Sequence, residues 1–188
     1  EIGTGRKLRS GENIAILSLG HIGNYASQLC YEYDKEGMHI GHYDLRFAKP
    51  LDQKMLHEVF QNYEHIITIE DGCISGGVGS SVIEFMVDNQ YNSSVYRLGI
   101  PDEFIEHGSQ TQLHAYCGYD KNSLRNKIEK IKSKRLFFVS RINSPRCLMF
   151  SISNLLKGVY HIYVPCKCSF LRIRGRNKHN KLICVEFN

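Results

Sequence analysis

The sequence predicts an α/β fold with a mostly parallel sheet and helices on both faces. The first indication is residues 65–85, HIITIEDGCISGGVGSSVIEF, where an apolar run passes through a glycine-rich turn into apolar residues at helical spacing. The second is the run of Ile66, Ile67 and Ile69, which is typical of a strand buried on both faces. The third is that the order of strand, turn and helix recurs on both sides of this segment.

The elements before this segment follow the same order. Residues 1–13 are polar and punctuated by glycines, so they are predicted to be a linker from upstream domains. Residues 14–19 (IAILSL) form a predicted buried strand, and Gly20 opens the turn into a helix. Residues 39–45 (HIGHYDL) form the second strand. The sequence KPLD then begins a helix whose apolar face holds Met55, Leu56, Val59 and Phe60.

The elements after the glycine turn complete the pattern. A helix is predicted from Val78 to Val87, and a fourth strand from Val95 to Ile100. Ser109 is the predicted N-cap of a short helix that Gly118 closes. Asp120 is the predicted cap of a last helix, KNSLRNKIEKI, which ends near residue 131. Four strands alternating with five helices predict one α/β domain over residues 14–131.

Residues 132–188 differ from the rest of the chain in charge and in the pattern of apolar residues. Residues 1–131 hold 12 Lys and Arg against 18 Asp and Glu, whereas residues 132–188 hold 12 against 1. The overall charge of +5 is therefore a property of this basic tail, and it does not predict nucleic-acid binding by the whole chain. The runs RLFFVSRI, VYHIYV and KLICVEF indicate strand propensity without a predicted architecture.

The cysteines and the apolar runs bear on the compartment. Seven cysteines at irregular spacing leave one over in any full pairing and include no C-x-x-C pair, so they are predicted to be reduced thiols. No run approaches the roughly 18 apolar residues of a membrane span. The first residues carry no apolar signal segment. We expect a cytoplasmic protein with no membrane partner.

The glycine turn has two possible functions, anion binding and close packing. Backbone amides at a helix N-terminus bind anions, which makes Gly76, Gly77 and Gly79 candidates for an anion contact or an interface. The phosphate-loop pattern fails because Val78 stands where a lysine is required, and the dinucleotide pattern fails as well. Close packing of the strand against the helix is the favoured interpretation.

Three charged residues follow strands and are candidates for an interface or an anion contact. Glu70 and Asp71 end the central strand, where α/β sheets place ligand sites, but neighbouring strand residues point to opposite faces and make a poor acid–base pair. Arg46 follows the second strand. It could reach a ligand or a neighbouring subunit's carboxylate, or form a surface ion pair worth about 0–1 kcal/mol.

No catalytic, cofactor-binding or metal-binding residue is predicted. His39 and His42 fall on opposite faces of a strand, which argues against a shared metal. Cys73 with His65 as a base lacks a third group to orient the pair, so an ordinary thiol is favoured. In the tail, Cys166 and Cys168 with His161, His179 and Cys184 do not have the spacing typical of structural zinc.

Four segments together resemble a known family. They are EIGTGRKLRSGENIAILSLG, YDLRFAKPLD, HIITIEDGCISGGVGSSVIEF and LGIPDEFIEHGSQTQLHAYCGYD, in this order. On these residues, 1–131 resemble the C-terminal (third) domain of the 1-deoxy-D-xylulose-5-phosphate synthases, a thiamine-diphosphate-dependent family related to transketolase. The chain departs from the family at residues 70–72, where Glu-Glu-Asn is usual, and at residues 21–24, which replace a threonine-containing segment.

The resemblance implies a three-layer fold and a role in assembly. It implies a five-stranded mixed sheet, one strand more than the residues predict, and a domain at the subunit interface. In the full-length enzymes thiamine diphosphate and magnesium catalyse condensation of pyruvate with glyceraldehyde 3-phosphate, for isoprenoid precursors, and other domains hold them. We therefore expect this chain alone to bind neither cofactor and to be inactive, its partner being a twin in a homodimer or the missing catalytic domains of the same enzyme.

The basic tail has no counterpart in the family. Its abrupt change in charge and composition indicates an appended or out-of-frame segment, and a lineage-specific extension is the alternative. The tail also opens an alternative function of a different class. Arginines 172, 174 and 176 are interleaved with lysines and with the aromatic residues Tyr163 and Phe170. Such a pattern would suit binding to nucleic acid or to another anionic surface.

Overall fold

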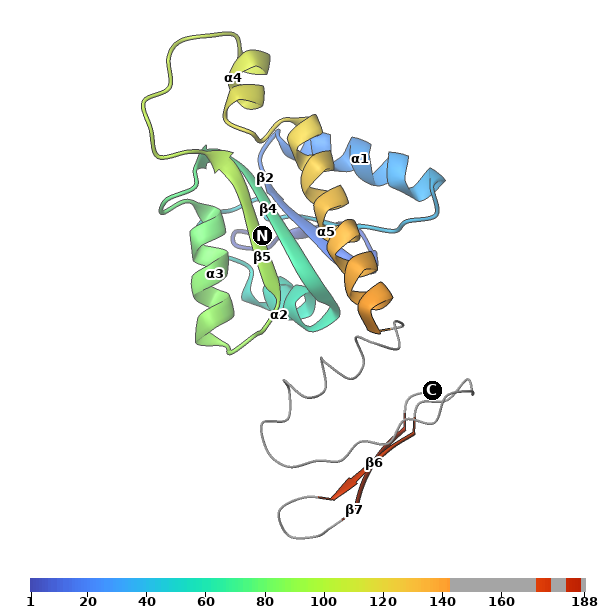
Figure 1. The fold of residues 1–188 in the computed structure, drawn as a ribbon. Coiled ribbons are helices and arrows are strands. Elements are labelled where there is room, and N and C mark those ends of the chain that lie inside the picture. The colour runs from blue at the N-terminus through green and yellow to red at the C-terminus, as the bar shows by residue number, and fades with distance from the viewer. Residues whose placement is uncertain (143–171, 177–181, 187–188) are drawn as a thin grey trace. The chain divides into compact units, whose positions relative to one another are not determined.

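The structure, a computed structural model, describes residues 1–142, 172–176 and 182–186 (Figure 1). The chain divides into two compact units, Glu1–Ser133 and Lys134–Asn188. Within its described residues, the second unit contains the end of helix α5 (Lys121–Ile142) and a two-stranded antiparallel sheet. This sheet pairs β6 (Arg172–Arg176) with β7 (Leu182–Glu186).

The first unit is built on a five-stranded mixed sheet in the order β1-β3-β2-β4-β5. Its four parallel strands are β2 (Asn13–Leu19), β3 (Gly41–Asp44), β4 (Tyr63–Cys73) and β5 (Ser94–Ile100). The edge strand β1 (Arg6–Arg9) runs antiparallel to β3. In the register of the central strands, Ile16 of β2 lies between His42 of β3 and Ile67 of β4. The predicted α/β class and the implied fifth strand are confirmed.

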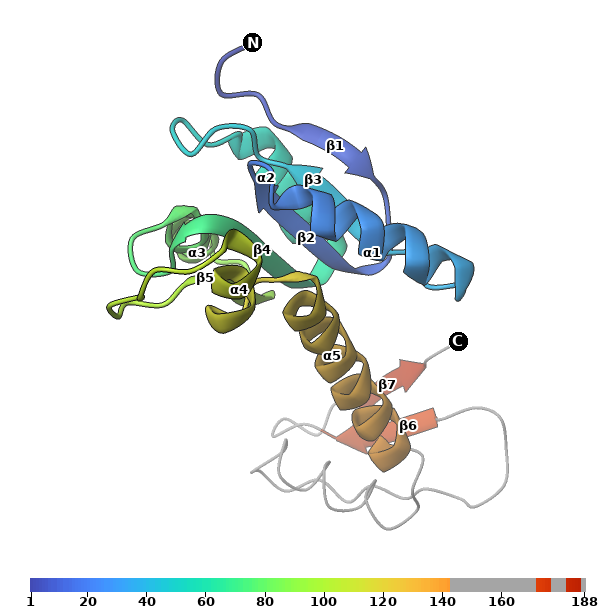
Figure 2. The same cartoon turned by 90° about the horizontal axis from the view of Figure 1, so that it is seen from above.

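Helices cover both faces of this sheet and make three layers (Figure 2). Helices α1 (Gly23–Lys35) and α5 share one core cluster with Ile14 and Ile16 of β2. Helices α2 (Gln53–Asn62) and α3 (Val78–Asp88) share the other with Ala15 and Leu17. Because successive strand residues point to opposite faces, β2 must be apolar at every one of these positions, which is the run that the sequence shows.

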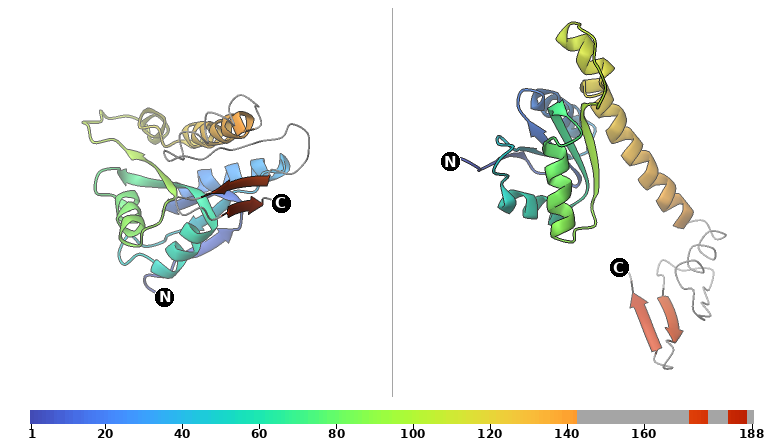
Figure 3. Two further views of the ribbon diagram at one scale, coloured as in Figure 1. Left: turned by 60° about the horizontal axis from the view of Figure 1, so that its bottom comes forward. Right: turned by 90° about the vertical axis from the view of Figure 1, so that its left-hand side faces the viewer.

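The predicted helix starts are confirmed by their hydrogen bonds. Ser109 forms a capping box with Gln112 at the start of α4 (Gln110–Tyr116). The carboxylate of Asp120 accepts a hydrogen bond from the backbone N–H of Ser123 at 3.0 Å, and that of Asp52 accepts one from Met55 at 3.0 Å. Helix α4 and the loop before it lie at the edge of the sheet where the parallel strands end (Figures 1 and 3).

The structure corrects two expectations at the ends of the domain. Strand β1 lies inside the predicted linker of residues 1–13. Its four residues, RKLR, are mostly exposed because the strand pairs on one side only, so they carry no apolar alternation. Helix α5 continues to Ile142 and includes RLFFVSRI, for which strand propensity was predicted. No glycine or proline interrupts residues 121–142, so nothing in the sequence stops the helix near residue 131.

The other two tail segments have different outcomes. Residues 182–186 of KLICVEF form β7, in agreement with the predicted strand propensity. The segment VYHIYV lies outside the described residues. None of the helices in the described part of the chain is long and apolar enough to cross a membrane.

Candidate functional site

The fold places a candidate site at the carboxyl ends of β2 and β4. These strands are neighbours in the sheet. The chain leaves β2 toward α1 on one face and leaves β4 toward α3 on the other. At such a switch point the two loops diverge and leave a crevice, which is where open α/β sheets bind ligands. The residues after β2 and β4 are therefore the first to consider.

The side chain of Glu70 faces α3, and both of its carboxylate oxygens accept hydrogen bonds there. The residue is 5% exposed. Its carboxylate accepts hydrogen bonds from the backbone N–H groups of Val78 at 2.8 Å and Gly79 at 2.9 Å. These amides belong to the first turn of α3, where the helix dipole also favours a negative charge. The position that an external anion would take is thus occupied by the chain's own carboxylate.

The glycine turn is shaped for this close packing. A Cβ atom on Gly77 would lie 2.5 Å from Oε2 of Glu70, and one on Gly79 would lie 2.5 Å from Oγ1 of Thr68. Gly76 has φ +73°, which glycine adopts without strain. The structure therefore supports the packing interpretation. A diphosphate does not fit here, because it would have to displace Glu70 from the amides that it satisfies.

Asp71 points to the opposite side, as predicted for a neighbouring strand residue. The Tyr119 hydroxyl donates a hydrogen bond to its Oδ1 at 2.8 Å. The other carboxylate oxygen, Oδ2, lies 3.8 Å from Nε2 of His21, which follows β2. The two carboxylates at the end of β4 therefore act separately.

His114 of α4 completes a group that the sequence did not predict. Its side chain is only 3% exposed, and its ring lies 4.7 Å from that of Tyr119 and 5.9 Å from that of His21. One nitrogen or oxygen atom each of His21, Asp71 and His114 lies within 4.8 Å of the other two. We call these three residues the His21 cluster. They are separated by 43 residues or more in the sequence, so no local motif could reveal them.

A cavity of about 470 Å³ adjoins the His21 cluster. It is bounded by Asp71 and His114 of the cluster and by His107, Gln110 and Tyr119. Burial, together with the neighbouring Asp71 carboxylate, raises the pKa of the Tyr119 hydroxyl above its usual value. Tyr119 is therefore a hydrogen-bond donor to Asp71 throughout the neutral range. The cavity combines a carboxylate, imidazole rings and apolar walls, which is a common composition of small-ligand sites.

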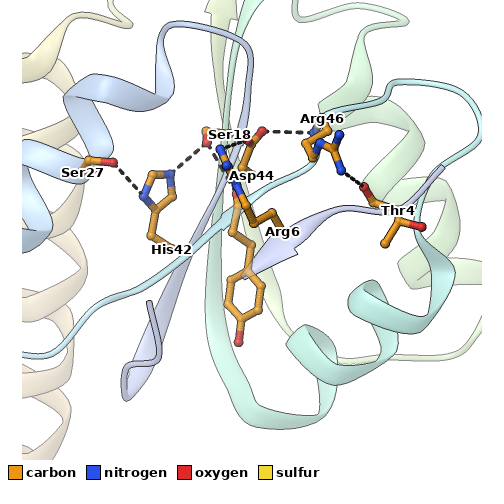
Figure 4. A network of polar contacts seen from close by, with 8 residues as sticks. Thr4, Arg6, Ser18, Ser27, His42, Asp44 and Arg46 are labelled. Atoms are coloured by element: carbon orange, nitrogen blue, oxygen red, sulfur yellow. Dashed lines mark hydrogen bonds and ion pairs between the residues drawn. The ribbon is translucent and has the colours of Figure 1, made fainter. Parts of the chain in front are cut away.

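Arg46 contacts Thr4 and Asp44 (Figure 4). Its guanidinium donates to the backbone oxygen of Thr4 at 3.3 Å, and its backbone N–H donates to Asp44 at 3.1 Å. Asp44 also pairs with Arg6 at 3.1 Å. Among the described residues, the partners of Arg46 are thus in the N-terminal segment and at the end of β3. Its predicted contact with a ligand or a neighbouring subunit stays a prediction.

The buried residues Ser18 and His42 and the exposed Ser27 form a network that resembles a nucleophile with its base (Figure 4). Oγ of Ser18 lies 2.8 Å from Nε2 of His42, and Oγ of Ser27 lies 3.3 Å from Nδ1. Burial lowers the pKa of His42 to about 4. A Cβ atom on Gly23 would lie 2.6 Å from the Ser18 hydroxyl, so helix α1 packs directly on it. The buried Ser18 hydroxyl therefore has no room for a substrate beside it, and we interpret the network as structural.

The structure also locates two other pairs of candidate residues from the sequence, His65 with Cys73 and His39 with His42. His65 and Cys73 lie near opposite ends of β4, about 25 Å apart for a strand of this length, so His65 cannot activate the thiol. His42 is buried, while His39 is exposed and lies 3.0 Å from Asp34, so the two histidines lie in different environments. Of the residues around the candidate site, only Asp71 was predicted. His21, His114 and Tyr119 were missed.

Comparison with known proteins gives the family. The family model for the C-terminal domain of transketolase matches residues 3–124. The 1-deoxy-D-xylulose-5-phosphate synthase of Cytophaga hutchinsonii is 49% identical over 130 residues, 69% of this chain and 20% of the relative. That of Bacteroides thetaiotaomicron is 50% identical over 130 residues, with the same coverage. The chain thus spans about a fifth of the length of these relatives.

Solved structures agree with the sequence relatives. A split-gene transketolase, described as an inactive β4 tetramer, superposes with a TM-score of 0.61 and 26% identity over 69% of this chain and 41% of that one. A transketolase from Campylobacter jejuni, at a TM-score of 0.51 and 15% identity over 68% of this chain and 18% of that one, shares the fold. The chain therefore belongs to the transketolase C-terminal domain family, within which it matches the 1-deoxy-D-xylulose-5-phosphate synthases.

Proposed function

We propose that this chain serves as the C-terminal domain of a 1-deoxy-D-xylulose-5-phosphate synthase and contributes to assembly rather than to catalysis. The observation that carries this proposal is the unequal coverage of the sequence match: 69% of this chain against 20% of the relatives. A domain that corresponds to a fifth of the enzyme needs the other domains for the enzyme's activity. The partner is either the catalytic domains of the same enzyme or a second copy in a homodimer.

Two further observations support a role without catalysis. Glu70 occupies the α3 N-terminus, so the diphosphate of thiamine diphosphate has no place at the glycine turn. The split-gene transketolase relative is described as inactive in its β4 form. We therefore expect no pyruvate decarboxylation and no thiamine diphosphate binding by the isolated chain. Calorimetry with cofactor and magnesium tests this, and a saturable micromolar signal would contradict it.

The assembly surface that we propose is the loop of residues 101–109 with the exposed side of α4. The side chain of Phe104 is fully exposed, and Tyr116 is 69% exposed. Both belong to the segment after β5, at the edge where the parallel strands end. Large exposed aromatic residues are costly to hydrate, and they are enriched at protein interfaces. Other apolar residues in the loops after the strands are less available for contact: Ile74 and Phe47 are half-buried, and Val78 is buried.

Complementation in trans tests the proposal. The remaining four fifths of the Cytophaga hutchinsonii synthase, expressed without its own C-terminal domain, would be mixed with this chain. We expect the mixture to form 1-deoxy-D-xylulose 5-phosphate while each part alone forms little. The variant Phe104→Ser should weaken the complex, since interface aromatics often contribute 2 kcal/mol or more.

The matched control is Val87→Ser. Val87 is 61% exposed but lies near the end of α3, away from the proposed surface. It should leave complementation unchanged. Turnover by this chain alone, or failure of two separately folded parts to associate at any ratio, would contradict the proposal.

The basic tail supports a second candidate, binding to a nucleic acid or another anionic surface. Residues 132–188 carry 12 basic residues against 1 acidic residue, and arginines 172, 174 and 176 alternate along β6. Titration with single-stranded nucleic acid at several salt concentrations tests it. Tight binding that weakens steeply with salt would favour this candidate, because neutralised phosphates release counterions.

A further inference from the structure

The geometry points to the His21 cluster as a binding site for a divalent transition-metal ion of the zinc or cobalt type. Its donors would be two imidazole nitrogens and one carboxylate oxygen. No such site is expected from the sequence, and it is independent of the proposed role in assembly.

The donor distances suit an ion after a small adjustment. Nε2 of His21 lies 3.8 Å from Oδ2 of Asp71, and all three donor atoms lie within 4.8 Å of one another. A tetrahedral zinc ion with ligands at about 2.0–2.2 Å holds its donors about 3.3 Å apart. His21 and Asp71 are exposed enough to move by this amount, whereas His114 is fixed by burial.

Neighbouring side chains already orient the donors. The hydroxyl oxygen of Tyr25 lies 3.4 Å from Nδ1 of His114, a contact that helps to hold the imidazole ring in place. Tyr119 donates to Oδ1 of Asp71, which leaves Oδ2 for an ion. Such outer hydrogen bonds are a regular feature of metal sites, where they set the tautomer and the ring orientation.

Among the described residues, Gln110 is a neighbour that competes with an ion for His21. Its amide Nε2 lies 3.3 Å from Nε2 of His21. The contact is on the surface, so a metal ion can displace the amide without leaving a buried polar group unsatisfied. Replacing Gln110 by alanine should therefore leave ion binding unchanged or strengthen it.

The surroundings favour a transition metal with an open position. Two imidazoles suit zinc, cobalt, nickel or copper better than magnesium or calcium, which prefer oxygen ligands. Three protein ligands leave the fourth tetrahedral position for water or a ligand, and the adjoining cavity of about 470 Å³ gives that position space. The site also lies at the switch point between β2 and β4, where the fold provides a crevice.

A bound ion would connect three segments that are distant in the sequence. They are the turn after β2, the end of β4 and helix α4. Because the unfolded chain does not hold these donors together, ion binding stabilises the folded state in proportion to ion concentration. Thermal stability is therefore a second readout beside binding.

Cobalt titration of the full, tag-free chain under reducing conditions tests the proposal. We expect visible d–d absorption of a four-coordinate ion at one equivalent, zinc competition for it, and a higher Tm with either ion. The variants His21→Ala and Asp71→Asn should weaken binding by at least about tenfold, the smaller of the effects seen when support of a metal ligand is lost. Both residues are partly exposed, so these variants should fold.

The control is His39→Ala, which removes an exposed histidine that also lies beside a carboxylate. It should bind cobalt like the unaltered chain. Equal binding by the His21→Ala and His39→Ala variants would overturn the proposal, as would the absence of any cobalt signal. Thiolate-to-cobalt charge-transfer absorption that survives His21→Ala but is lost in Cys166→Ser/Cys168→Ser would place the ion on the tail cysteines and also overturn it.

Discussion

Glu70 and Asp71 are adjacent residues at the end of one strand, yet they lie in opposite kinds of environment. Glu70 is buried, and both of its carboxylate oxygens accept backbone amides of α3. Asp71 is partly exposed, accepts one hydrogen bond from Tyr119 and faces two histidines beside a cavity. A charge at the end of a parallel strand is thus no sign of a ligand site by itself. What matters is whether the following loop satisfies that charge.

The largest effect is expected from Glu70→Ala. This change leaves two buried N–H groups without an acceptor, at about 1–3 kcal/mol each, so the free energy of unfolding should fall by about 2–6 kcal/mol. Urea denaturation measures it. Glu64→Ala, on the exposed side of the same strand, is the control and should change stability by less than about 0.5 kcal/mol. A similar loss of stability in both variants would contradict the structural role of the two hydrogen bonds that Glu70 accepts.

The burial of His42 predicts a pH dependence of stability. Because the folded pKa of His42 is lowered to about 4 from 6.5, the unfolded chain binds more protons between these values. The free energy of unfolding should therefore fall as pH falls from about 6.5 toward 4, by at most about 3 kcal/mol from this residue. Tm measured over this range should have a smaller slope in His42→Asn and an unchanged slope in His39→Gln. Equal slopes of Tm against pH in the His42→Asn variant and the unaltered chain would contradict the lowered pKa of His42.

Close packing at the glycine turn predicts a moderate effect for Gly79→Ala. The new Cβ atom would lie 2.5 Å from Oγ1 of Thr68 and 3.0 Å from Cγ of Arg97. Overpacking of this kind costs about 1–3 kcal/mol, more than alanine gains over glycine inside a helix. Chemical denaturation should show that adding Thr68→Ala restores part of the loss. A stabilised Gly79→Ala variant would mean that the turn is loose and open to an anion.

The smallest effect is expected from Asp71→Asn. An amide oxygen can still accept the Tyr119 hydrogen bond, and the partly exposed carboxylate is screened by water. Without added metal, stability should change by less than about 1 kcal/mol. A loss as large as that of Glu70→Ala would show that Asp71 is structural as well, and the contrast between the two residues would disappear.

A structural element can be predicted from the sequence when the interactions that form it leave a pattern in neighbouring residues. Strands β2 and β4 are predictable because burial of their central residues on both faces favours a nearly continuous apolar run. The capping residues Ser109, Asp52 and Asp120 act within three residues of themselves, so their roles are readable locally. Strand β1 was missed because an exposed edge strand needs no apolar pattern. The end of α5 was missed because no breaking residue marks it.

The sequence by itself determined the layers, the family resemblance and the charge contrast of the tail, because periodicity, motif order and composition are properties of the chain alone. Only the tertiary structure decided which strand-end residues meet. His21, Asp71 and His114 come together because β2 and β4 are neighbours and α4 returns over their ends. The carboxylate of Glu70 is unavailable to a ligand because the turn after it folds back and donates two backbone N–H groups to it. Distance along the chain carries no information about such contacts, since the sheet order that creates them is set by packing of the whole domain.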